Sequence, residues 1–204
     1  MTLFKSINPY NRELVVERPL HKKREWLGLL NKAHEGFLEW RLLSLDQRVD
    51  ELQKVRAKLL ERKEELAQMA TVEMGKPIHE ARAEIQKCVV SMEQLFEFAP
   101  EALATKTITA DYYLSEVSYE GMGAILGIMP WNYPYWQVIR FAIPTLLAGN
   151  AVLLKHAPNV PGCSMLLEAV FQQSSRLGKV YNALYTDSKT TLKIIQKPEI
   201  RGVS

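Results

Sequence analysis

Few residues of this sequence combine a reactive side chain with a spacing that could support chemistry. Thiolates act as nucleophiles, and thiolate and imidazole groups are common zinc ligands. The histidines are dispersed without ligand spacing, so no metal site is indicated: His21, His34, His79 and His156. Cys88 shares a helical face with Ile85 and Met92, which predicts a core position. Cys163 precedes an expected helix, whose dipole could lower the pKa of its thiol.

Two short segments place polar residues after apolar runs, where a parallel sheet would bind a ligand. Residues 130–134 (PWNYP) follow the run 123–129, and residues 155–158 (KHAP) end the run 151–155. Ligands of open parallel sheets bind beyond the carboxyl ends of the strands. The glycine-rich dinucleotide fingerprint is absent, so spacing alone does not establish a nucleotide site. By position alone, Trp131 is a packing residue, Asn132 a helix cap and Lys155 a solvated strand end.

The elements that would position these segments are strands and helices in alternation over residues 121–204. Continuous apolar runs suit strands that are buried on both faces of a parallel sheet. The expected strands are residues 123–129, 151–155, 180–184 and 200–203, and the expected helices are 132–147, 164–173 and 190–196. Alternation of this kind implies right-handed crossovers, and therefore an α/β fold with a doubly wound parallel sheet.

Residues 1–104 predict an arm followed by amphipathic helices. The first twenty residues are polar and turn-rich, and apolar residues then recur at helical spacing. The last of these helices is expected from Glu80 to about Phe98, because Pro100 should end it. Residues 105–120 alternate in polarity and are rich in Thr, Tyr, Ile and Val, which predicts a β ribbon. Exposed strands are often covered by another subunit, so we expect a homo-oligomer formed through this ribbon.

Composition excludes several classes of protein. The chain has 204 residues, of which 47% are hydrophobic and 24% charged, so it can build one sizeable core. The net charge of +3 is spread along the chain, and no nucleic-acid partner is expected. No apolar run could span a bilayer, no signal peptide is visible, and two cysteines make no disulfide framework. We therefore expect a cytoplasmic protein without a membrane partner.

Several segments in collinear order resemble one known family. These are residues 73–77 (EMGKP), 81–84 (ARAE), 129–134 (MPWNYP), 143–155 (IPTLLAGNAVLLK) and 198–204 (PEIRGVS), which together extend over most of the chain. They resemble the NAD(P)-dependent aldehyde dehydrogenases. The resemblance implies a Rossmann-type cofactor domain and the oxidation of an aldehyde to a carboxylic acid.

The resemblance also implies roles for the residues at the strand ends. Asn132 matches an asparagine whose amide forms part of an oxyanion hole, and a helix cap remains the alternative. The implied cofactor contacts are Met129, Pro130, Trp131, Asn132, Lys155, His156, Ala157 and Pro158. Lys155 matches a lysine that binds the adenosine ribose, and its charge could reach a 2′-phosphate. Pro158 stands where NAD-preferring relatives often carry a glutamate, so the departure favours NADP, or dual use, over strict NAD.

Residues 155–163 resemble the succinate-semialdehyde dehydrogenase branch. Arg140 lies eight residues after Asn132, where members acting on that substrate carry an arginine facing the carboxylate. A guanidinium pairs well with a carboxylate. The alternative for Arg140 is an exposed helix arginine without a ligand.

The family mechanism needs a nucleophilic cysteine and a glutamate that activates water. The resemblance places both beyond Ser204, and it places Cys163 on a cofactor-side helix away from substrate. We therefore expect the chain by itself to be inactive. Two other interpretations remain open: a non-catalytic module for cofactor binding or oligomerisation, and an inactive truncated remnant.

Overall fold

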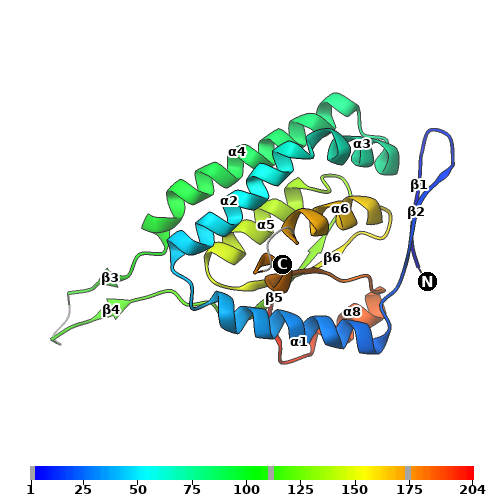
Figure 1. Ribbon diagram of the computed structural model, residues 1–204. Helices are drawn as coiled ribbons and strands as arrows, with labels where there is room; N and C mark the ends of the chain where they lie inside the picture. Colours follow the sequence, from blue (N-terminus) through cyan, green and yellow to red (C-terminus); the bar gives the residue numbers. More distant parts are fainter. Residues whose placement is uncertain (1–2, 110–112, 173–175) are drawn as a thin grey trace.

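The computed structural model describes residues 3–109, 113–172 and 176–204 (Figure 1). An amino-terminal hairpin extends along one side of the molecule. It consists of the antiparallel strands β1 (Leu3–Ile7) and β2 (Leu14–Pro19), with an irregularity between Ser6 and Ile7. The hairpin is anchored where the Lys5 N–H donates to the Pro158 carbonyl at 3.1 Å, beside one of the predicted loops.

Amphipathic helices follow the hairpin, as the apolar spacing predicts. They are α1 (Lys23–Trp40), α2 (Leu45–Glu61), α3 (Lys63–Met74) and α4 (Ile78–Ala102). Ser44 and Gln47 form a capping box that begins α2. Gly75 ends α3 with φ of 72°, a left-handed conformation that glycine adopts without a Cβ clash.

The prediction that the last helix ends before Pro100 is wrong. Pro100 lies inside α4, which continues to Ala102. The Leu103 N–H bonds to the Ala99 carbonyl at 2.9 Å, so the final turn closes around the proline. A proline removes one backbone donor, and in a final turn that loss interrupts little of the helix.

The segment after α4 forms a two-stranded ribbon that projects from the body of the molecule (Figure 1). Its strands are β3 (Lys106–Thr107) and β4 (Glu116–Val117), paired antiparallel, and the Ile108 N–H extends the pairing to the Ser115 carbonyl at 2.8 Å. Residues 110–112 of the predicted ribbon lie outside the described residues.

A parallel sheet forms the centre of the molecule and confirms the predicted α/β class. Its strands are β5 (Ala124–Met129), β6 (Ala151–His156), β7 (Tyr181–Ala183) and β8 (Ile200–Val203), in the order β7-β6-β5-β8. The chain moves outward from β5 to β7 and then returns to the other side of β5. This reversal is the hallmark of a doubly wound sheet.

The helices between these strands lie close to the predicted ranges. They are α5 (Trp136–Leu147), α6 (Pro161–Phe171), α7 (Leu177–Val180) and α8 (Ser188–Ile195). The sequence did not predict the short α7, and α5 begins four residues later than expected. Residue 173 of the predicted helix 164–173 lies outside the described residues.

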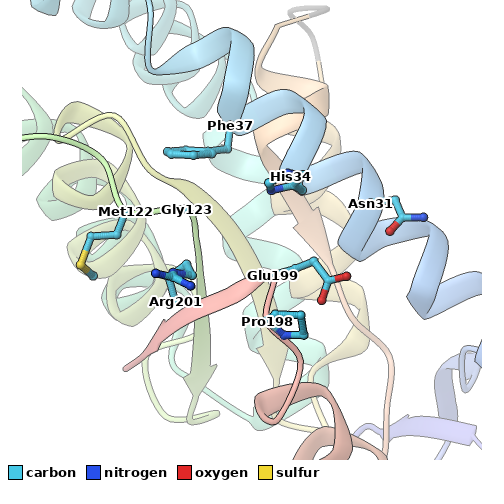
Figure 2. Close-up of a pocket in the computed structure, with 8 residues that line it drawn as sticks. All are labelled: Asn31, His34, Phe37, Met122, Gly123, Pro198, Glu199 and Arg201. Carbon is cyan, nitrogen blue, oxygen red and sulfur yellow. The ribbon is translucent and has the colours of Figure 1, made fainter.

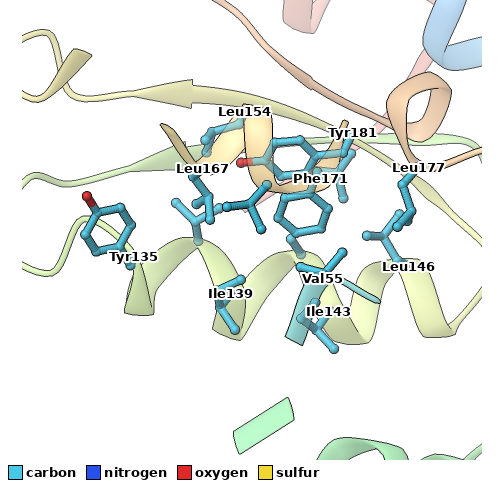
Figure 3. Close-up of a cluster of buried hydrophobic side chains, with 14 of the residues drawn as sticks. Val55, Tyr135, Ile139, Ile143, Leu146, Leu154, Leu167, Phe171, Leu177 and Tyr181 are labelled. Carbon is cyan, nitrogen blue, oxygen red and sulfur yellow. The ribbon is translucent and has the colours of Figure 1, made fainter. Parts of the chain in front are cut away.

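Helices cover both faces of the sheet (Figure 1). On one face α5 and α6 pack beneath α2, α3 and α4, while α1 and α8 lie on the other. Figure 3 shows the core between α5, α6, β6 and β7, where the rings of Phe171 and Tyr181 stack with centroids 3.8 Å apart. Burial of each large apolar side chain contributes roughly 1.5–3 kcal/mol to folding. Within the described residues, no helix combines the length and apolar character needed to cross a membrane.

Candidate functional site

The two predicted loops meet at one edge of the sheet. Strands β5 and β6 are hydrogen-bonded neighbours in parallel, with Ile128 opposite Lys155 and Met129 opposite His156. The segments 130–135 and 157–160 therefore leave the sheet side by side. The loop between β5 and α5, residues 130–135, is called the Asn132 loop below.

His156 joins the two loops from inside the protein. Its side chain is buried, Nε2 donates to the Pro134 carbonyl at 2.9 Å, and Nδ1 accepts from the Ala157 N–H at 2.8 Å. These two bonds assign the neutral tautomer protonated at Nε2. Burial lowers the pKa of His156 to about 4, although the bond to the Pro134 carbonyl acts in the opposite direction. Because both ring nitrogens are engaged, His156 fixes the loops rather than facing solvent.

Asn132 does not cap a helix, contrary to one of the two expectations. Helix α5 begins at Trp136, and no side chain of its own N-cap region caps it. Glu84 of α4 takes that role, since its Oε1 accepts from the N–H groups of Tyr135 and Trp136 at 2.8 and 2.9 Å. Asn132 itself is exposed, and no described residue hydrogen-bonds to its side-chain amide. The amide is therefore free to meet a ligand.

A buried ion pair lies directly beneath the Asn132 loop. Lys76 Nζ contacts Glu84 Oε2, and the two residues are 6% and 3% exposed. The same ammonium lies 3.4 Å from the Asn132 carbonyl oxygen and 3.9 Å from the ring centroid of Tyr133. No sequence pattern pointed to this pair, which contacts the chain at the predicted oxyanion residue and at the residues that follow it.

Lys155 presents a partly desolvated cation on the neighbouring strand. It is half-buried, burial lowers its pKa, and its Nζ lies 5.5 Å from the ring centroid of Phe4. No ion pair joins it to any side chain that the structure describes. Ile128 lies opposite Lys155 and is 41% exposed, so apolar surface borders the cation. An unpaired, partly buried ammonium favours an anionic or hydroxyl-rich ligand.

The remaining predicted cofactor residues line the same edge to different degrees. Met129 is buried, Trp131 is 49% exposed, and Pro130 is exposed. Ala157 and Pro158 are partly buried. A pocket of about 370 Å³ adjoins this edge, between the hairpin, the end of α3 and the loops, with Trp131 in its lining.

Arg140 lies on α5 and is exposed. Among the described residues, no hydrogen bond or ion pair connects it to Asn132 or Lys155. The structure therefore brings the two loops together and leaves the predicted carboxylate-binding residue on the adjacent helix surface.

Another pocket, of about 390 Å³, lies at the opposite ends of the strands (Figure 2). It is bounded by α1 and by the amino ends of β5 and β8, with His34, Gly123, Glu199 and Arg201 in its lining. None of the predicted site residues contributes to it. In a doubly wound sheet the ligand end is the carboxyl end, which is the location of the Asn132 loop.

Neither cysteine has the properties of a nucleophile. Both are free and buried, and burial raises the pKa of Cys88 and of Cys163. The expectation that a helix dipole could lower the Cys163 pKa is wrong, because desolvation dominates and the nearby Glu73 carboxylate adds to it. The N–H groups at the start of α6 instead bind Glu73, whose carboxylate accepts from Gly162 and Cys163 at 2.7 and 2.8 Å.

Comparison with known proteins agrees with the fold. A family model described as the aldehyde dehydrogenase family matches residues 1–204. The chain is 39% identical over 199 residues to a succinate semialdehyde dehydrogenase [NAD(P)+] of Escherichia coli strain K12, covering 98% of this chain and 43% of the relative. It is 37% identical over 197 residues to a probable succinate-semialdehyde dehydrogenase [NADP(+)] of Synechocystis, covering 97% and 43%.

A solved structure shares the fold closely. The succinic semialdehyde dehydrogenase of Streptococcus pyogenes, in complex with NADP+ as the cofactor, superposes with a TM-score of 0.92 at 25% identity, covering 98% of this chain and 44% of that one. The chain thus spans less than half the length of the relatives it matches. Since the family model extends over the whole sequence, this chain belongs to the aldehyde dehydrogenase family.

Proposed function

We propose that the chain forms the cofactor-binding part of an aldehyde dehydrogenase that oxidises succinate semialdehyde to a carboxylic acid with NADP. One observation carries the proposal: the partly buried ammonium of Lys155 and the exposed amide of Asn132 stand at the same edge of a doubly wound sheet, and no described side chain pairs with either group. The relatives described above support it, because they are succinate-semialdehyde dehydrogenases of NAD(P)+ or NADP+, one of them solved in complex with NADP+.

The residues at this edge fit a nicotinamide dinucleotide. When bound, that cofactor supplies the hydride acceptor for aldehyde oxidation. Lys155 would bind the adenosine ribose and a 2′-phosphate, because no residue that the structure describes forms an ion pair with its ammonium. Met129, Pro130 and Trp131, together with Ala157, would border the cofactor. His156 would hold the two loops in place from inside the protein, since both nitrogens of its buried ring are hydrogen-bonded to loop backbone groups.

Pro158 supports NADP over strict NAD. A carboxylate at this position would accept from ribose hydroxyls and would repel a 2′-phosphate. Proline offers neither an acceptor nor a negative charge, so the ammonium of Lys155 decides the local potential. Dual use of NAD and NADP remains compatible with this arrangement.

The Asn132 amide would stabilise the negative charge that develops on the aldehyde oxygen during attack by a thiolate. Preorganised donors of this kind are typically worth about 3–4 kcal/mol. Arg140 would pair with the substrate carboxylate. Both cysteines of the chain are buried and protonated, so we propose that the nucleophilic cysteine and the glutamate base come from polypeptide outside this sequence.

Titration of the purified chain with NADP and NAD tests the cofactor proposal. We expect saturable NADP binding, visible as a change in the fluorescence of the half-exposed Trp131. Lys155→Ala should weaken NADP binding by about tenfold or more, as expected for a lost charged hydrogen bond. Pro158→Glu should weaken NADP more than NAD. Lys193→Ala, an exposed lysine of α8, is the control. No saturable binding of either cofactor would refute the proposal.

An activity assay tests the assignment of the chemistry. The 204-residue chain should form no NADPH from succinate semialdehyde. Turnover that disappears in Cys163→Ser would overturn the proposal that the nucleophile lies elsewhere.

We further propose that the 105–120 ribbon joins copies of the chain in a homo-oligomer. Its described residues expose several apolar side chains: Ile108, Leu114, Val117 and Tyr119 are 39–59% exposed. Light scattering should show an oligomer that Ile108→Glu and Val117→Glu shift toward the monomer. An unchanged molar mass in these variants would contradict this role of the ribbon.

A further inference from the structure

The start of α5 is held from outside its own segment. The free N–H groups at a helix start need acceptors, and usually a nearby side chain supplies them. Here the acceptor is Glu84, which is 51 and 52 residues away along the sequence from Tyr135 and Trp136. Its second carboxylate oxygen contacts Lys76, so one buried carboxylate is satisfied by two amides and one ammonium.

Lys76 also contacts the Asn132 loop directly. Its ammonium reaches the Asn132 carbonyl oxygen at 3.4 Å and lies over the Tyr133 ring, while Glu84 binds the backbone at Tyr135. The two members of the pair therefore contact the chain at Asn132 and again within the following few residues.

We infer that the Lys76–Glu84 pair is the positioning device for the Asn132 amide. The inference rests on the proposed function, in which that amide meets the developing oxyanion. A donor in an oxyanion hole must be held close to its productive geometry, by residues that are themselves locked by packing and hydrogen bonds. The pair meets this requirement, because it is buried and because either charge without the other would be uncompensated.

A purely structural role is the competing explanation, and the chain contains a matched control for it. Glu73 is as buried as Glu84, at 3% exposed, and it also caps a helix start, that of α6. Glu73 also accepts from the Ser6 hydroxyl at 2.6 Å and interacts with the Cys163 side chain. Among the described residues, no hydrogen bond joins Glu73 directly to the Asn132 loop. Glu73→Gln should therefore loosen the fold in a similar way without moving Asn132.

Nuclear magnetic resonance of the ¹⁵N-labelled chain provides the readout. The side-chain amide signals of Asn132 are assigned by their loss in Asn132→Asp. We expect Glu84→Gln and Lys76→Met to shift these signals and to speed hydrogen exchange at the Tyr135 and Trp136 amides by about tenfold or more. Lys76→Arg, which keeps the cation, should restore most of the wild-type spectrum.

The Glu73→Gln control tests whether the loss of any buried helix-capping carboxylate shifts the Asn132 signals. Glu73→Gln should perturb the amides of Gly162 and Cys163 and leave the Asn132 side-chain signals in place. Unchanged Asn132 signals in folded Lys76→Met and Glu84→Gln would overturn the inference, and so would an equal shift in Glu73→Gln. Should Glu84→Gln fail to fold, Lys76→Met and Lys76→Arg give the same comparison.

The NADP titration is independent of this experiment. A chain that binds no NADP but shows the expected shifts would refute the proposed function and leave the positioning of Asn132 standing. A chain that binds NADP, but whose Asn132 side-chain signals do not change when Lys76 or Glu84 is substituted, would refute the positioning inference alone.

Discussion

His156 should make the folded chain sensitive to mild acid. Burial lowers its folded pKa to about 4 from an ordinary value of 6.5. Below pH 6.5 the unfolded chain therefore binds a proton at His156 that the folded chain refuses. The stability that neutral His156 contributes is therefore fully present above pH 6.5 and is lost progressively as the pH falls toward 4. Protonation would also place a hydrogen on Nδ1, which accepts from the Ala157 N–H.

The size of the effect follows from the difference between the two pKa values. Each pH unit in this window removes about 1.4 kcal/mol of stability. Between about pH 7.5 and about pH 5, His156 should therefore lower the free energy of unfolding by about 2 kcal/mol. Most of the imidazole is shielded from solvent, so screening should reduce this value little.

The assay is urea unfolding followed by tryptophan fluorescence at both pH values. His156→Gln can still donate to the Pro134 carbonyl but cannot titrate, so the variant should lose about 2 kcal/mol less than the wild type on acidification. His79→Gln removes an exposed imidazole of α4 and should not reproduce this difference. Equal losses in the wild type and His156→Gln would refute the reasoning.

Two further predictions concern packing and thiol chemistry. Gly127→Ala should destabilise the fold by about 1–3 kcal/mol in urea unfolding, because the new Cβ would lie 2.4 Å from the Phe141 ring, and Phe141→Leu should relieve part of that loss. A Gly127→Ala protein as stable as the wild type would contradict the close packing of the Phe141 ring on Gly127. Cys88 and Cys163 should both resist a thiol reagent in the native chain and react after denaturation, since burial raises both pKa values. Rapid labelling of native Cys163 would contradict its placement.

The sequence predicted the sheet well because strands buried on both faces are continuous apolar runs. Residues 124–129 and 151–156 are mostly apolar, with Gly123 and Pro130 next to the first strand and Gly149 and Pro158 two residues from the ends of the second. Boundaries were less predictable where tertiary contacts decide them. Helix α5 begins at Trp136 because Glu84 caps it there, and no local signal within 132–136 marks that position.

The buried charges could have been found by a stricter use of periodicity. Glu84 lies three residues after Ala81 and four before Cys88, so it belongs to the apolar face of α4. A carboxylate on that face must find buried donors, because an unpaired buried charge is strongly unfavourable. The sequence gives no indication, however, that those donors are the start of α5 and Lys76. That partnership depends on how α4 crosses α5 in three dimensions.

Glu73 and Glu84 together explain why this fold needs its amino-terminal helices. Each carboxylate comes from the α3–α4 layer, and each accepts two backbone N–H groups at the start of a helix that follows a central strand. A negative charge at a helix start is favoured by the helix dipole. The helical layer thus fixes where α5 and α6 begin, and with them the two loops at the carboxyl edge of the sheet. Without these two carboxylates, the starts of α5 and α6 would lose their acceptors, and this layer would no longer fix the placement of Asn132 relative to Lys155.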